Sequence, residues 1–106
     1  MGRYHLGEYS SYDQLEYLIQ SDEKVIVLVY SDNDSQSGEA RDEVSRLSDQ
    51  YYGVGFVFVD VDEQPNIYSS LGYPSYPSVL AYQDGSPVYV SGHYDSVENE
   101  FLHGCC

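Results

Sequence analysis

The only thiols of this 106-residue chain are Cys105 and Cys106, which are adjacent and follow His103 closely. Thiolates are nucleophiles, redox partners and ligands of soft metals. Adjacent cysteines can close only a small strained ring, which would be easily reduced and would not stabilise a fold. The pair therefore suggests a displaced redox site, a soft-metal site, a lipid-attachment signal or, most simply, a flexible tail over residues 103–106.

A second group able to do chemistry consists of aspartates in two short segments, Asp32 with Asp34 and Asp60 with Asp62. Carboxylate oxygens are ligands of Ca²⁺, but the spacing is not that of a twelve-residue calcium loop closed by Glu. We therefore expect helix capping and solvated charge at these positions, and we assign no metal ligand and no cofactor. Low-affinity binding of divalent cations by the acidic surface is an alternative function.

Ser35 and Ser37 supply hydroxyls within a polar segment, residues 31–38, that contains no Cys, His, Lys or Arg. A serine nucleophile needs a neighbouring base, and this segment supplies none, so we assign no catalytic residue here. A helix N-terminus at this place could hold an anion. The nearby carboxylates favour ordinary N-capping instead.

The strand and helix on either side of this segment must position its side chains. Residues 25–30 are continuously apolar, which predicts a strand buried on both faces of a sheet. From Glu39 onward the apolar residues are spaced four, three and four apart, which predicts one face of a helix: Ala40, Val44, Leu47 and Tyr51. We expect Gly53 to end this helix in a left-handed conformation. A loop between a central strand and a helix is where α/β proteins usually place their chemistry.

The remaining segments alternate between strand and helix patterns. Strands are predicted over residues 3–8, 54–61, 78–83 and 87–91, with Asp84-Gly85 as the turn between the last two. Helices are predicted after a capping box at Ser11 and Gln14, around Ile67, and from Asp95 to Phe101. This order predicts one α/β domain over residues 1–106, with parallel strands first and an antiparallel hairpin at its end.

The composition is strongly acidic, because 18 Asp and Glu against 4 Lys and Arg give a formal net charge of −14. Such a surface repels nucleic acid and anionic membranes, and it attracts basic proteins and peptides. Solubility or salt tolerance is the simpler explanation of the acidity. No signal peptide or transmembrane run is visible, so we expect a soluble cytoplasmic monomer, away from membranes unless Cys105 and Cys106 are lipidated.

Five landmarks along the chain resemble the thioredoxin and protein disulfide isomerase superfamily. They are residues 27–31 as the strand before the active site, residues 58–62 as the "VDVD" segment, residues 71–78 as the cis-proline loop, and the glycines Gly85 and Gly92. The resemblance covers nearly the whole chain. It implies the thioredoxin fold, in which a central mixed β-sheet with an antiparallel C-terminal hairpin is flanked by four helices.

The sequence departs from this family where the family's chemistry lies. The CxxC motif falls on Ser35-Gln36-Ser37-Gly38, the tryptophan before it falls on Asp34, and the buried acid falls near Val29. Disulfide exchange needs a thiolate made reactive at a helix N-terminus. The resemblance therefore implies a thioredoxin-like domain without redox catalysis at the usual site, with Ser35 and Gly38 as the degenerate motif positions.

The resemblance also implies a cis peptide bond before Pro77, with Tyr76 presenting its backbone to an extended segment of a partner. The expected binding face consists of Asp34, Ser35, Gln36, Tyr73, Ser75, Tyr76 and Pro77. Tyrosines among small polar residues are typical of antibody binding surfaces, although Tyr73 and Tyr76 could simply pack the loop. We therefore expect a redox-inactive domain that binds a protein or peptide with a basic or extended segment. The alternative is a thiol-disulfide oxidoreductase that uses Cys105 and Cys106.

Overall fold

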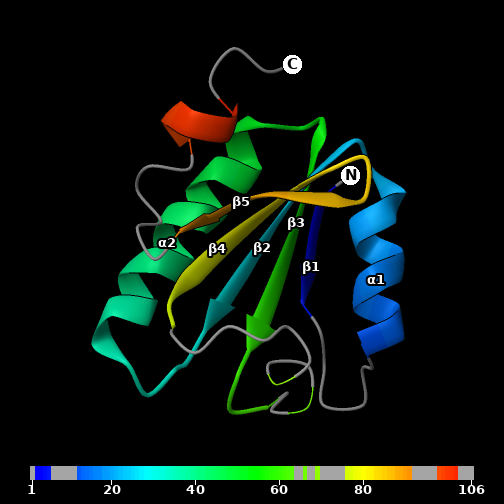
Figure 1. The fold of residues 1–106 in the computed structure, drawn as a ribbon. Helices are drawn as coiled ribbons and strands as arrows, with labels where there is room; N and C mark the ends of the chain where they lie inside the picture. The colour runs from blue at the N-terminus through cyan, green and yellow to red at the C-terminus, as the bar shows by residue number, and fades with distance from the viewer. Residues whose placement is uncertain are drawn as a thin grey trace.

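The computed structural model describes residues 2–5, 12–63, 66, 69, 76–91 and 98–102. Figure 1 shows a twisted sheet with one α-helix on either side. The strands are Gly2–His5 (β1), Lys24–Tyr30 (β2), Val54–Asp60 (β3), Ser78–Gln83 (β4) and Ser86–Ser91 (β5). The α-helices are Tyr12–Ser21 (α1) and Ser35–Gln50 (α2), and a short π-helical segment spans Glu98–Leu102.

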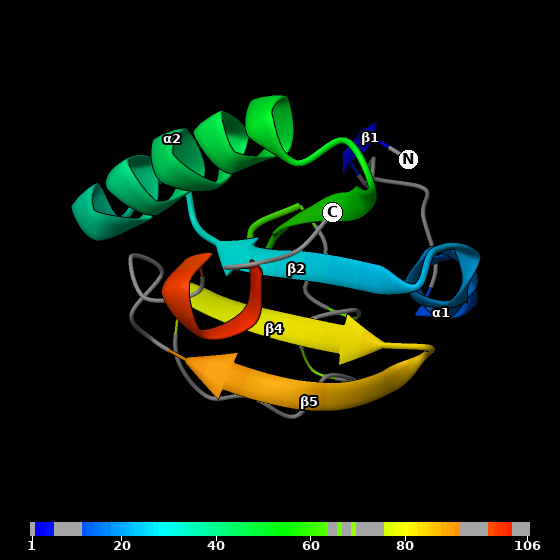
Figure 2. The ribbon, with the colours of Figure 1, turned by 90° about the horizontal axis from the view of Figure 1, so that it is seen from above.

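The five strands form one mixed sheet in the order β1-β3-β2-β4-β5, and β2, β4 and β5 lie side by side in Figure 2. β1 and β2 run parallel to β3, whereas β4 is antiparallel to β2 and to β5. Val29, near the end of β2, pairs with Ser78, and Lys24, at its start, pairs with Gln83. The start of β4 therefore lies at the same end of the sheet as the end of β2, and the β4–β5 turn lies at the opposite end.

The core has two halves because successive side chains of a strand point to opposite faces of the sheet. Ile26 and Leu28 pack on the side of α2, and Val27 packs on the side of α1. Leu102 of the π-helical segment is fully buried and completes the α2 side. β2 and β3 are buried on both faces, as their apolar runs predict.

The first turn of α2 differs from the sequence-based expectation. The helix begins at Ser35, four residues before the predicted start at Glu39, because Asp34 is its N-cap and its side chain accepts a hydrogen bond from the N–H of Ser37. Part of the expected loop is thus helix. The prediction that Gly53 ends this helix with a positive φ was also wrong, because Gly53 is not among the described residues with positive φ. The helix ends earlier, with Tyr51 as its C-cap, and the Tyr51 N–H donates to the Leu47 carbonyl at 3.0 Å.

The β4–β5 hairpin follows its turn signal. Asp84 and Gly85 both have positive φ, 53° and 85°, as a two-residue hairpin turn requires. β4 has the predicted bounds, and β5 begins one residue early at Ser86. β1 spans Gly2–His5, so it also begins one residue before its predicted range of 3–8. Residues 6–11, including the predicted cap at Ser11, lie outside the described residues.

The predicted number of four helices is not reproduced in the described part of the chain, which contains two α-helices and one π-helical segment. Asn66 and Ser69 are helical, but Ile67 and most of that predicted helix lie outside the described residues. The same holds for Gly92 and for the predicted cap at Asp95. No helix among the described residues is long and apolar enough to cross a membrane.

Candidate functional site

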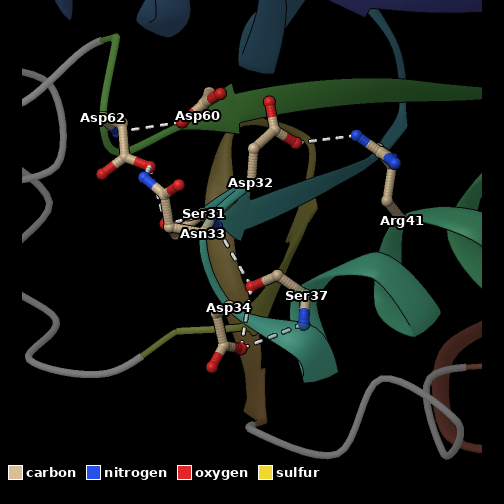
Figure 3. A network of polar contacts seen from close by, with 8 residues as sticks. All are labelled: Ser31, Asp32, Asn33, Asp34, Ser37, Arg41, Asp60 and Asp62. Carbon is tan, nitrogen blue, oxygen red and sulfur yellow. Dashed lines mark hydrogen bonds and ion pairs between the residues drawn. The ribbon is translucent and has the colours of Figure 1, made fainter.

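The candidate site lies where β2 passes into α2, and the segment after β3 lies against it (Figure 3). The two segments are joined through the backbone, since the N–H of Val61 donates to the Tyr30 carbonyl at 2.8 Å. Both follow the C-terminal ends of parallel strands, which end at the same edge of the sheet. This arrangement gathers residues 31–37 and 60–62, two segments that are far apart in the sequence.

Ser37 and Asp34 hold the start of α2 (Figure 3). Asp34 Oδ2 accepts from the N–H of Ser37 at 3.0 Å and from its hydroxyl at 3.2 Å. The Ser37 hydroxyl oxygen accepts in turn from the N–H of Ser31 at 3.0 Å, and Ser37 is fully buried. Ser37 is therefore a structural residue. Ser35 and Gln36 are exposed, so they are the motif positions that a partner could contact.

Asp62 and Arg41 fix the rest of the loop. Asp62 Oδ2 accepts from the hydroxyl of Ser31 at 2.7 Å and from the side-chain amide of Asn33 at 3.0 Å. Arg41 of α2 forms an ion pair with Asp32 at 2.7 Å, and its guanidinium lies 5.9 Å from the centre of the Tyr30 ring. Sequence reasoning missed these contacts because they join residues up to 31 positions apart.

The expectation of a solvated charge is wrong for Asp60, which is only 5% exposed. Its Oδ1 accepts from the N–H of Asp62 at 2.9 Å. Burial raises the pKa of Asp60, and the nearby carboxylates of Asp32 and Asp62 raise it further, whereas the hydrogen bond from the Asp62 N–H lowers it. The pKa of Tyr30 is also raised, mainly by burial and next by the negative charge of Asp60. The position of Asp60 inside an otherwise apolar run was the sequence signal for its burial.

Replacing Asp60 by Asn should stabilise the domain at neutral pH by on the order of 1 kcal/mol. The pKa of Asp60 is higher in the folded state than in the unfolded state. Asp60 therefore contributes fully to the free energy of unfolding below its unfolded-state pKa, and this contribution is lost as the pH rises through its folded-state pKa. An amide removes this titration and can donate to Asp32. Urea unfolding between pH 3 and 8 should show a flatter profile for the variant than for the parent. A variant profile parallel to the parent's would contradict the prediction, and the exposed Asp42→Asn serves as control.

Tyr76 and Pro77 lie at the same end of the sheet as this network, because they directly precede Ser78, which pairs with Val29. The Tyr76–Pro77 peptide bond is cis. Tyr76 is 44% exposed, whereas Pro77 is buried. The structure thus brings these two residues to the edge that carries Asp34, Ser35 and Gln36. Tyr73 and Ser75, the other predicted members of the face, lie outside the described residues.

The C-terminal segment is anchored at the other end of the sheet. Arg46, near the end of α2, forms an ion pair with Glu98 at 3.1 Å, and the Tyr51 hydroxyl donates to the same carboxylate at 2.8 Å. Lys24, at the start of β2, donates to the Phe101 carbonyl at 3.1 Å. Leu102, the last described residue, therefore lies far from Ser35. Cys105 and Cys106 lie outside the described residues.

The acidic residues do not form a metal centre in the part of the chain that the structure describes. Among those residues, no group of three or more His, Cys, Asp or Glu side chains is placed so that it could hold a metal ion. The carboxylates of the site are instead engaged with protein donors, as Asp34 is with Ser37 and Asp62 is with Ser31.

Comparison with solved structures identifies the fold. A thioredoxin of Entamoeba histolytica superimposes with a TM-score of 0.81 at 19% identity, over 97% of this chain and 100% of that one. The oxidised thioredoxin of Plasmodium falciparum gives 0.79 at 18% identity, over 97% and 99% of the two chains. A thioredoxin variant from Halobacterium salinarum gives 0.79 at 18%, over 92% and 86%. The chain therefore has the thioredoxin fold.

No protein-family model and no curated sequence matches this chain. The likeness thus lies in the backbone rather than in the sequence, and it fixes the architecture alone. In this chain the first turn of α2, Ser35-Gln36-Ser37-Gly38, carries hydroxyl groups and no thiol.

Proposed function

We propose that this chain is a redox-inactive thioredoxin-fold domain that binds an extended, basic segment of a protein or peptide. The binding surface is the α2-end face, defined as residues 31–38 together with 76–78. The observation that carries the proposal is the exposed ring of Tyr76 beside the buried Pro77, at the sheet end where α2 starts without a thiol.

The absence of thiol chemistry at this face follows from the side chains present. A serine hydroxyl replaces a thiolate only when a base removes its proton. The Ser37 hydroxyl already donates to the carboxylate of Asp34, and Arg41 of the same helix is ion-paired with Asp32. The helix N-terminus is likewise satisfied by Asp34, which disfavours an anionic ligand.

The binding role is supported by rigidity and exposure together. The network of Ser31, Asp34, Ser37 and Asp62 fixes the loop before any partner arrives, which lowers the entropic cost of binding. Tyr76 offers a large ring with few rotatable bonds, the kind of anchor that concentrates binding energy. An extended partner segment could pair with the backbone beside Pro77, and the acidic surface favours a basic one.

The proposal predicts that Tyr76→Ala weakens peptide capture. Random peptides displayed on phage are selected on the immobilised parent domain, and the enriched sequences are synthesised and titrated by fluorescence anisotropy. We expect enrichment of sequences with Lys or Arg, and binding at least about tenfold weaker for Tyr76→Ala, because a central aromatic anchor usually contributes more than 1 kcal/mol.

The matched control is Tyr52→Ala, which removes a ring that is 80% exposed in the turn between α2 and β3. It should leave binding unchanged, and both variants should unfold at the parent's urea midpoint within error. Equal affinities for the parent and Tyr76→Ala would show that the α2-end face is not the binding site.

A further inference from the structure

A cleft of about 280 Å³ lies between α1 and the β4–β5 hairpin, away from the α2-end face. Its apolar walls come from Tyr12 and Ile19 of α1 and from Tyr82 and Pro87 of the hairpin. Ile19 and Tyr82 are nearly buried, so they form its floor, and the exposed Glu16 lies at its rim. The cleft can therefore take one apolar side chain next to a negative charge.

A second depression adjoins this cleft. Asp22, Glu23 and Asp84 line it, and Gln20 and Gly85 line both depressions. A Cβ built on Gly85 would lie 3.2 Å from Gln20 Cγ, so the Gln20 side chain lies against the turn between them. One flexible side chain thus separates an apolar cleft from a group of three carboxylates.

The charges of this surface all have one sign. Four carboxylates line the two depressions, and no Lys, Arg or His is among their lining residues. Lys24, at the start of β2, donates to the Phe101 carbonyl, and its Nζ lies 4.7 Å from the centre of the Phe101 ring. Carboxylates accept charge-assisted hydrogen bonds from guanidinium groups, often two at a time.

We propose that the α1–hairpin cleft is a second docking surface, which binds an extended peptide with an apolar residue two positions from an arginine. Side chains at i and i+2 of an extended peptide point the same way and lie about 7 Å apart. The apolar side chain enters the cleft between Ile19 and Pro87. The arginine reaches the carboxylates beyond Gln20, and a second arginine on the other side meets Glu16.

This surface is independent of the proposed function. The β4–β5 turn lies at the opposite end of β2 from the α2-end face, as the pairings of Lys24 with Gln83 and of Val29 with Ser78 show. The two ends of the seven-residue β2 are about 20 Å apart. A single side chain of a peptide cannot reach both the cleft and the α2-end face, so the two sites can be tested separately.

The probe is a fluorescein-labelled peptide, Gly-Arg-Ser-Leu-Ser-Arg-Gly, whose arginines flank the leucine at two positions on either side. Anisotropy titration should give saturable binding that weakens with added salt. In ¹⁵N spectra the amides of Glu16, Gln20 and Gly85 should shift. The double variant Glu16→Gln, Asp84→Asn should bind at least about tenfold more weakly, and Asn tolerates the positive φ at residue 84.

The matched control is Asp42→Asn, Asp49→Asn, which removes the same net charge from exposed positions on α2. It should retain the parent's affinity at the cleft, read from the shifts of Glu16, Gln20 and Gly85. Tyr76→Ala should retain it as well, because it changes only the other site. The proposal is overturned by absence of binding at millimolar protein, by equal weakening in the control, by equal binding of a peptide with Glu in place of Arg, or by shifts confined to residues 34–38 and 76.

Discussion

Introducing cysteines at Ser35 and Gly38 should turn this domain into a disulfide reductase. Residues i and i+3 on a helix are neighbours, with a separation that suits a disulfide. A Cβ built on Gly38 has no heavy atom within 4 Å, so a cysteine fits there without displacing a neighbour. A thiol at Ser35 would lie at the exposed N-terminus of α2, which stabilises the thiolate.

The measurement is insulin reduction by dithiothreitol, on four proteins. The parent and the Ser35→Cys, Gly38→Cys variant are each assayed with and without Cys105→Ser, Cys106→Ser. We expect at least about tenfold acceleration from the introduced pair in either background, the scale that a low-pKa exposed thiol supplies. The parent should give none over the reductant alone.

Two results would contradict this view. Acceleration by the parent that disappears in Cys105→Ser, Cys106→Ser would mean that the tail is the redox site and that the domain is an oxidoreductase. An inactive but folded Ser35→Cys, Gly38→Cys variant would mean that more than the missing thiols prevents exchange at this face. Asp34 and Val29, the other two positions at which the sequence departs from the family that it resembles, would then be the next to change.

Ser37→Ala should destabilise the domain by about 2 kcal/mol, which is the largest stability loss that we expect from a small change at the site. The hydroxyl oxygen of Ser37 is the acceptor for the buried N–H of Ser31, at 3.0 Å. Alanine leaves that donor without a partner, and an unsatisfied buried donor costs about 1–3 kcal/mol. For a domain of this size the melting temperature should fall by about 10 °C.

Ser35→Ala is the matched control, because it makes the same change two residues away at an exposed position. Both variants gain the slightly higher helix propensity of alanine, so the difference between them isolates the buried hydrogen bond. Ser35→Ala should stay within about 0.5 kcal/mol of the parent. Equal unfolding free energies for the two variants would mean that the Ser31 N–H finds another acceptor.

The strands of the β-sheet and its C-terminal hairpin were predictable from local sequence patterns. Two apolar runs predicted β2 and β3, because a strand buried on both faces admits few polar residues. Asp84-Gly85 predicted the hairpin, because a turn with positive φ admits few residue types. These are local constraints, so they can be inferred without knowing which segments meet.

The candidate site required the tertiary structure. The sequence alone determined that residues 31–38 contain no thiol, since that depends only on which residues are present. It could not determine that Asp34 rather than a serine caps α2, that Ser37 is buried, or that Asp60 is buried beside Asp32. The cap and the Ser31–Ser37 hydrogen bond are local, but several residue types could have made them. The burial of Asp60 depends on β2 and β3 ending side by side, which brings together segments about thirty residues apart.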